Sequence, residues 1–283
     1  VKTDSGAVAW DGEGIVTKGT GNGGEMFALD VTGDGYRIYG WGPPVDDGEG
    51  GFDNGPLQIA QSTVLPNSAW QHLVGTAVEG GQIKLYVNGV EVASGDAAPV
   101  LMFNDHDISI GSRQTPIDVN PDLNYNMSFD GLIDEVAVYD RALASGEVVG
   151  HFHAAFDEEV LPPPTPTTPS ALGNFGQVAL DAGPVGYWRL ETNEGTTAAD
   201  TANAVGAPQD GPQDGVYQDM SLFDRGQPGP RPTDLVDGQP LLGFAEDNYA
   251  ADFQGDQDGG NDVVLIPDDG TLDFSVGGAF SVE

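Results

Sequence analysis

Glycine and proline divide this chain into short segments, and that division limits the folds it can adopt. The 283 residues include 42 glycines and 20 prolines, and no stretch sustains the apolar period of a long helix. Short runs of β-branched and aromatic residues lie between turn-forming residues instead. This pattern favours an all-β protein in which many short strands form an antiparallel β-sandwich.

Acidic residues dominate the charge of the chain. Asp and Glu number 45 against 9 Lys and Arg, which gives a formal net charge of −36. Such a surface repels the phosphates of nucleic acids and of anionic lipids, so we expect no nucleic-acid partner and no membrane partner. The acids are spread along the chain, and 39% of residues are hydrophobic, which favours folded domains with acidic surfaces. Two interpretations of the acids stay open: a hydrated surface suited to saline surroundings, or sites for hard cations such as calcium.

The absence of cysteine excludes disulfides, thiolate metal sites and thiol nucleophiles from this sequence. No apolar run approaches the roughly 20 residues that span a bilayer, and no signal peptide opens the sequence. We therefore expect any export signal or membrane anchor to lie outside it.

Two hairpins can be placed from their turns. Asn88-Gly89 lies between two apolar runs, and both of its residues tolerate the positive φ of a two-residue hairpin turn. The segment 32–35, Thr-Gly-Asp-Gly, predicts a second turn between strands at 26–31 and 36–39. Further strands are predicted at 62–65, 70–77, 83–87, 90–94 and 108–111.

The stretch from Phe129 to Leu143, FDGLIDEVAVYDRAL, alternates β-branched residues with carboxylates. This alternation predicts a strand with one buried face and one solvated face, followed by a short amphipathic helical turn at 145–156. The stretch resembles the C-terminal signature of laminin G-like, concanavalin A-like jelly-roll modules. The phrases WQHLV, LYVNGV and ISIG, which begin at residues 70, 85 and 108, resemble the middle of the same module in the same order. The resemblance implies a jelly-roll β-sandwich.

A second block follows a linker. Residues 158–170 are rich in Pro and Thr and predict a semi-rigid polyproline II spacer, which rises about 3.1 Å per residue. Residues 171–283 then resemble the front half of the same module, whereas residues 1–157 resemble its back half. In the family, a phrase like FSVE at 280–283 runs on into a phrase like VKT at 1–3, so the two ends resemble the two sides of one cut through a strand.

Half a sandwich exposes apolar surface and unpaired strand edges, so each half needs a complement. Three arrangements stay open. The sequence is one repeat of a longer tandem chain, or copies assemble head to tail into a filament, or the chain is a permuted single module whose linker joins the natural termini. Other copies of the chain are therefore expected partners.

Two groups of acids are candidate calcium ligands. The resemblance implies such a role for Asp134, near the junction of the first and last strands. Glu191 and Asp200 follow the first strand of the front half and would add oxygens if that half folds against a back half that contains Asp134. The segment 256–262 alternates Asp256, Asp258 and Asp262 with glycine and amide residues, as calcium loops do. The alternative is that these carboxylates are solvated, or that Asp134 pairs with Arg141.

Aromatic residues are candidates for carbohydrate binding. Trp41 and Phe52 flank a Gly- and Asp-rich loop and are our glycan candidates, with capping of the sandwich core as the alternative. Trp70 and Trp188 lie on predicted strands and are expected in the core. His151 is expected in a solvated tail, and no motif singles out a catalytic residue.

These observations predict a non-enzymatic extracellular or cell-surface repeat that serves adhesion or builds a fibre and is stabilised by calcium. The alternative is a carbohydrate-binding module of a secreted glycoside hydrolase. A fold resemblance alone does not decide between them.

Overall fold

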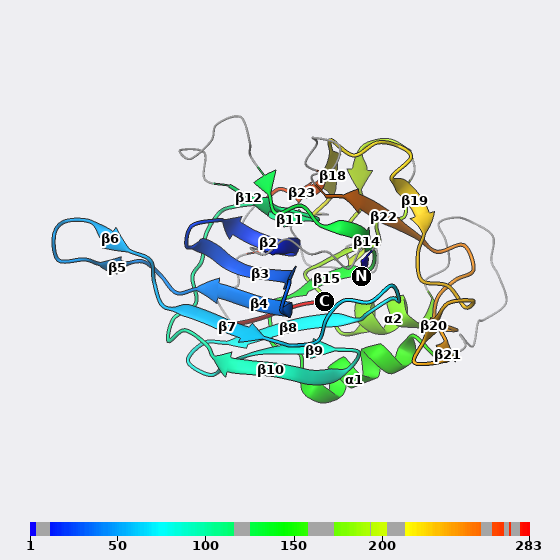
Figure 1. Ribbon diagram of the computed structural model, residues 1–283, viewed down its shortest axis with the longest axis horizontal. Helices are drawn as coiled ribbons and strands as arrows, with labels where there is room; N and C mark the ends of the chain where they lie inside the picture. The colour runs from blue at the N-terminus through cyan, green and yellow to red at the C-terminus, as the bar shows by residue number, and fades with distance from the viewer. Residues whose placement is uncertain are drawn as a thin grey trace.

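The computed structural model describes residues 1–3, 12–115, 125–157, 173–192, 194–202, 213–255, 262–268, 272 and 278–283. Three sheets of almost entirely antiparallel strands form the body of the molecule (Figure 1). The predicted all-β, antiparallel fold is confirmed. No described helix is both long enough and apolar enough to cross a membrane.

The order of the strands in space differs from their order along the chain. Taken in spatial order, the largest sheet contains β17 (Thr197–Ala198), β18 (Gly215–Gln218), β23 (Val263–Ile266), β11 (Ile108–Ile110), β2 (Glu13–Thr20), β3 (Gly24–Thr32), β4 (Gly35–Trp41) and β7 (Leu57–Gln61), with β12 (Arg113–Gln114) and β13 (Tyr125–Asn126) beside β2. The six-stranded sheet contains β10 (Val90–Asp96), β9 (Gln82–Val87), β8 (Leu73–Val78), β24 (Ala279–Val282), β15 (Val136–Tyr139) and β16 (Gly186–Trp188). The four-stranded sheet contains β1 (Lys2–Thr3), β14 (Asp130–Ile133), β22 (Tyr249–Gln254) and β19 (Arg225–Pro228). Two small hairpins are formed by β5 (Val45–Asp46) with β6 (Phe52–Asp53) and by β20 (Leu235–Val236) with β21 (Gln239–Pro240).

The main apolar core lies between the largest sheet and the six-stranded sheet. Phe27 of β3 and Phe280 of β24 stack across it, with their ring centroids 5.0 Å apart, and both are fully buried. Trp188 is also fully buried and Trp70 is nearly so, as predicted for both. The opposite face of the six-stranded sheet is covered by helices α1 (Ser145–Ala154) and α2 (Asn174–Asp181), which bury Ala137 and Tyr139 of β15 in a second cluster.

Strands from the two sequence blocks alternate within the same sheets. β24 lies between β8 and β15, with Ser281 opposite Thr76 on one side and opposite Tyr139 on the other. In the same way β22 pairs with β14, and β23 pairs with β11. Of the three arrangements left open by the sequence, the structure agrees with the third, because the two halves complete each other within this chain. The physical reason is that two complementary halves on one chain meet at a high effective concentration. The linker 158–170 lies outside the described residues, and the division into blocks stays a prediction.

Both predicted hairpins are present. Asn88 and Gly89 have φ of 51° and 76° between β9 and β10, as a two-residue turn with two positive φ angles requires. β3 ends at Thr32 and β4 begins at Gly35. The strand predicted at 62–65 is wrong. The hydroxyl of Ser62 accepts the backbone N–H of Val64, a local turn that competes with strand pairing, and the strand precedes it as β7.

The stretch 129–143 is two strands rather than one. β14 belongs to the four-stranded sheet and β15 to the six-stranded sheet, and the chain turns between them at Asp134 and Glu135, where Glu135 has a φ of 56°. The predicted solvated face is wrong, because all four residues of β15 are buried between the core on one side and the helices on the other.

Candidate functional site

Three carboxylates and one guanidinium gather at the turn between β14 and β15. Asp134 accepts a hydrogen bond from the side-chain amide of Asn248 through Oδ2 at 2.7 Å. Arg189, just beyond β16, bridges the other two carboxylates: its Nε lies 3.3 Å from Glu135 and a terminal nitrogen lies 2.7 Å from Glu191. The cluster therefore carries more negative than positive charge in a buried place.

Burial makes this excess charge costly, and the pKa values move accordingly. Burial raises the pKa of Asp134 well above its ordinary value, and the charge of Glu135 raises it further. Burial also raises the pKa of Glu191 to about 7, although Arg189 acts in the opposite direction. A bound proton or cation would therefore lower the electrostatic cost of burying these carboxylates.

The structure brings together two of the three calcium candidates of the first group, Asp134 and Glu191. Asp200 has another role: its Oδ1 accepts the backbone N–H of Tyr187 at 2.9 Å, and its Oδ2 accepts that of Gln213 at 3.2 Å. These bonds fix the segments on either side of β17. Asp200 is therefore engaged by backbone donors.

The cluster offers the oxygen ligands that calcium prefers, but their arrangement does not suit the ion. All are oxygens, and within the described part of the chain Glu135 Oε2 and Asn248 Oδ1 are buried without a hydrogen-bond partner. The guanidinium of Arg189 lies among them, however, and no group of three or more acidic or histidine side chains among the described residues could hold a metal ion. As placed, these residues do not fit a calcium ion, and calcium binding stays a prediction.

The second group of calcium candidates is only partly visible. Asp262 is buried just before β23, and its Oδ2 accepts the backbone N–H of Gln254 at 3.1 Å. Asp256 and Asp258 lie outside the described residues. The loop therefore adds no described ligand set.

The outward side of β3, β4 and β7, which we call the outer face, is a second candidate site. Met26 is an extra residue in β3, because Lys18 and Gly19 of β2 stand opposite Phe27 and Glu25. This bulge turns Glu25 to the same side of the sheet as Asp30 and leaves Met26 and Phe27 in the core. Two carboxylates thus share the outer face.

Trp41 lies on the outer face at the end of β4. It is partly exposed and stands opposite Leu57 of the edge strand β7, while Tyr39 stands opposite Ile59. Leu57 and Ile59 are 48% and 36% exposed. Phe52 is 75% exposed on the hairpin of β5 and β6, which projects from the body (Figure 1). The two glycan candidates therefore lie on one ribbon, Trp41 at its base and Phe52 on the projecting part.

A polar network lies beside Trp41 on the same face. Arg37 donates to Asp30 through Nε at 2.8 Å, and its guanidinium lies 4.6 Å from the ring centre of Tyr39. Glu25 accepts from Arg113 at 3.1 Å and from the hydroxyl of Tyr39 at 3.2 Å. Burial raises the pKa of Asp30 to about 6, with Arg37 acting in the opposite direction. Because both carboxylates are engaged by guanidinium groups, they hold the shape of the face rather than standing ready as an acid and a base.

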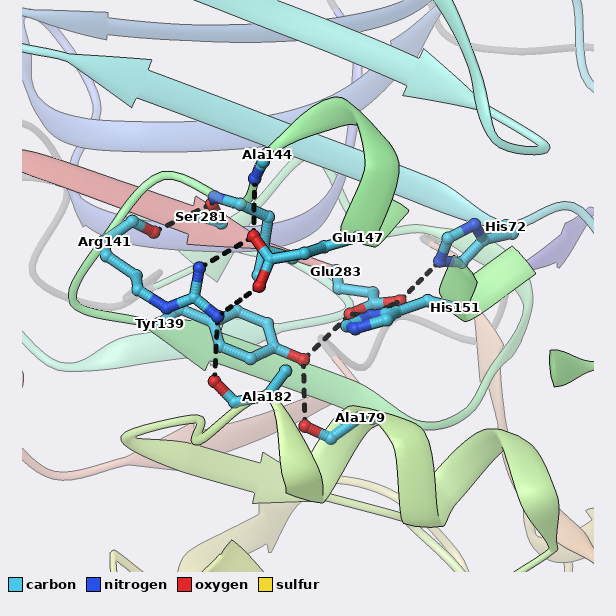
Figure 2. Close-up of polar contacts among 11 residues, drawn as sticks. His72, Tyr139, Arg141, Ala144, Glu147, His151, Ala179, Ala182, Ser281 and Glu283 are labelled. Carbon is cyan, nitrogen blue, oxygen red and sulfur yellow. Dashed lines mark hydrogen bonds and ion pairs between the residues drawn. The ribbon is translucent and has the colours of Figure 1, made fainter. Parts of the chain in front are cut away.

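A third cluster, which the sequence alone did not indicate, surrounds Glu283 (Figure 2). Its buried carboxylate accepts from His72 Nε2 at 2.5 Å, from His151 Nδ1 at 2.9 Å and from the hydroxyl of Tyr139 at 3.0 Å. The prediction that His151 is solvated is wrong, because it is 2% exposed. A signal existed: His151 follows the buried Val148 by three residues, which places both on one face of α1.

In this cluster, His151 and the carboxylate of Glu283 each stabilise the charged form of the other, and their pKa values are shifted accordingly. Burial alone would raise the pKa of Glu283, but the hydrogen bonds from His151 and His72 outweigh burial and hold that pKa well below its ordinary value. Burial alone would lower the pKa of His151, but Glu283 outweighs it and raises that pKa. The cluster joins α1, β15, β24 and the residue before β8 through one carboxylate.

The outer face and Asp134 lie in a part of the chain that matches a known protein family. Residues 1–149 match the laminin G-like family described as the concanavalin A-like lectin/glucanases superfamily. The chain belongs to this family. No curated protein and no solved structure matches the chain.

The laminin G-like match ends before Glu191, and the front-half resemblance of residues 171–283 stays a prediction. Laminin G-like domains are generally binding modules without catalytic activity, and they are typically extracellular. The family thus fits a carbohydrate-binding or adhesion-type module.

Proposed function

We propose that this laminin G-like chain is a non-enzymatic, extracellular adhesion module that binds a neutral carbohydrate on its outer face. The observation that carries the proposal is the partly exposed Trp41, which stands beside exposed Leu57 and next to the polar network of Arg37 and Tyr39. A neutral sugar is favoured because the net charge of −36 repels anionic polymers.

The chemistry of the outer face suits a sugar ring. The C–H face of a sugar packs on an aromatic ring, and its hydroxyls need hydrogen-bonding groups at the border of that contact. Trp41 supplies the ring, and Leu57 extends the apolar surface along the edge strand. Arg37 and Gln61, which stand opposite each other on the same face, supply polar groups at one end.

Affinity electrophoresis tests the proposal. The protein is run through native gels that contain a neutral polysaccharide: a β-glucan, a xylan or a mannan. We expect at least one to retard the protein, and Trp41→Ala to weaken that binding about 5- to 30-fold, which corresponds to roughly 1–2 kcal/mol. Phe223→Ala is the matched control, because Phe223 is 87% exposed at the turn between β18 and β19, away from the outer face. No retardation by any of the three, or equal binding by Trp41→Ala and wild type, would contradict the proposal.

Association with other copies, as a tandem array or filament, stays a prediction, as does attachment to a secreted hydrolase. Sedimentation of the purified chain over a range of concentrations tests self-association. A single monomer species throughout would remove the filament from the proposal.

Calcium as a structural ion stays a prediction too; it rests on the acidic composition, because the side chains around Asp134 do not fit the ion as they are placed. Thermal melts in millimolar calcium and in chelator test it. A higher midpoint in calcium, lost in Asp134→Asn, would support the ion, and equal midpoints would remove it.

A further inference from the structure

Lys18 of β2 and Asp268, two residues after β23, form an ion pair that is closed off from water. The Nζ of Lys18 lies 2.5 Å from Oδ2 of Asp268, and the two side chains are 0% and 1% exposed. Nζ also donates to the backbone carbonyl of His106, at 2.8 Å. The other Lys–carboxylate pair in the described part of the chain, Lys84 with Glu91, is 30% and 39% exposed.

The neighbours of Lys18 on the adjacent strands are apolar. Lys18 stands opposite Phe27 on β3 and opposite Ile108 on β11, and Ile108 in turn stands opposite Ile266 on β23. All three of these neighbours are fully buried. Transfer of a proton from Nζ to Oδ2 along their hydrogen bond would give the amine and the carboxylic acid that a condensation consumes.

We propose that Lys18 and Asp268 condense to an intramolecular isopeptide bond. The neutral Nζ attacks Cγ of the protonated Asp268, and the new C–N bond forms as the bond from Cγ to the hydroxyl oxygen breaks. Water leaves with one hydrogen from the acid and one from the amine. An ammonium and a carboxylate thus become one amide and one water molecule, and the step requires neither an oxidant nor a reductant.

The fold holds the two reacting groups in place before the reaction. The attacked Cγ is bonded to the oxygen that Nζ already contacts, so the groups start near the separation that intramolecular reactions need. The carbonyl of His106 orients Nζ, and Oδ1 of Asp107 accepts the backbone N–H of Asp268 at 3.0 Å. Asp107 is therefore a positioning residue. Such preorganisation replaces a bimolecular condensation with a unimolecular one.

The bond would have a clear structural effect. It would join β2, in the block 1–157, to the end of β23, in the block 171–283, across the intervening β11. A cross-link that closes so long a loop restricts the unfolded chain in the way a disulfide does, in a sequence that has no cysteine.

Intact-mass spectrometry of the denatured protein tests the proposal. We expect the wild-type chain to be lighter than its sequence by one water molecule, and its digest to contain a branched peptide that joins residues 18 and 268. Lys18→Arg keeps a cation beside Asp268 but cannot form this amide, and it should have the full mass. Lys84→Arg, in the exposed pair, should remain one water lighter than its own sequence.

Two results would overturn the proposal. One is the full sequence mass for the folded wild-type protein after prolonged incubation. The other is a mass deficit that hydroxylamine removes and that maps to an Asp-Gly dipeptide, which identifies a cyclic imide instead. The wild-type mass decides the question even if a variant does not fold.

Discussion

The cluster around Glu283 predicts that stability falls as the pH rises above about 6.5, the unfolded pKa of His151, and that His151 causes much of the fall. The hydrogen bond to the buried carboxylate of Glu283 raises the pKa of His151 against the effect of burial. Titratable groups around the pair include Tyr139, Glu147, Arg141, His72 and Glu135. The informative change is His151→Gln, which keeps a polar side chain but cannot carry a proton charge.

The magnitude follows from the hydrogen bond that is lost. A bond to a charged group contributes about 1.5–3 kcal/mol, and a neutral one contributes about 1 kcal/mol. At pH 6 we therefore expect His151→Gln to lower the free energy of unfolding by about 1.5–3 kcal/mol, a fall in Tm of about 3–10 °C for a domain of this size. Once the pH has risen through the folded pKa of His151 and the imidazole has lost its charge, the difference should shrink to about 1 kcal/mol or less.

The sign of the pH dependence follows from the direction of the shift. The folded pKa of His151 is raised, so its contribution is fully present below its unfolded value of 6.5 and is lost as the pH rises through the folded value. Across that window the folded state holds one more proton, and stability falls by at most about 1.4 kcal/mol per pH unit. Glu283 acts on the acid side: its lowered pKa gives stability that is present above 4.5 and is lost as the pH falls.

Urea unfolding of the wild type and of His151→Gln at pH 6 and pH 9 measures the difference in their free energies of unfolding at each pH. His153→Gln is the matched control, because His153 is exposed on the same helix two residues further on. The free energy of unfolding of the control should match that of the wild type at both pH values. Equal losses for His151→Gln at pH 6 and pH 9 would refute the reasoning, because a charge-dependent bond cannot cost the same with and without its charge.

Two further predictions concern the carboxylate cluster at the turn between β14 and β15. Arg189→Gln should lower the free energy of unfolding at pH 7 by about 3–5 kcal/mol, because it leaves Glu135 buried without its counter-charge. Lys84→Gln, in an exposed pair, should lower it by only about 0.2–1 kcal/mol. Similar losses for the two variants in urea unfolding would argue against a buried ion pair. The folded pKa of Glu191 is raised to about 7, so its ionisation makes the wild-type protein less stable as the pH rises from 4.5 to about 7. Glu191→Gln should therefore lose less stability than the wild type over that range. A pH profile identical to wild type would contradict the shift.

Local sequence chemistry predicted the turns and the strands next to them. Asn88-Gly89 fixes a hairpin because few residue pairs accept two positive φ angles, and the signal needs no knowledge of distant residues. The fold class followed from the same short segments. The helix at 145–154 was predicted as well, close to its observed bounds.

The sites were harder to predict because their partners are distant in sequence. The alternation in 129–143 shows that a strand exists, but not that the chain changes sheets at Asp134 and is covered on both sides. Glu283 lies 211 residues from His72 and 132 from His151, and Lys18 lies 250 from Asp268. From sequence alone, a charged residue is predicted to be solvated, because the distant residue that neutralises it is not known. The position of Trp41 on the outer face likewise depends on pairing with β7.

The central claim is that residues 278–283 pair with strands of the block 1–157 of the same molecule. Thr76 and Ser281 stand directly opposite each other on β8 and β24, at a spacing that suits a disulfide, and the chain has no other cysteine. The double variant Thr76→Cys with Ser281→Cys is purified under dilute, oxidising conditions and run on a non-reducing gel, with Thr76→Cys and Ser221→Cys as the mismatched control. We predict a disulfide-closed monomer for the first pair and free thiols for the control. Disulfide-linked dimers and higher multimers from the first pair would contradict the account, because they would show that the halves pair between copies.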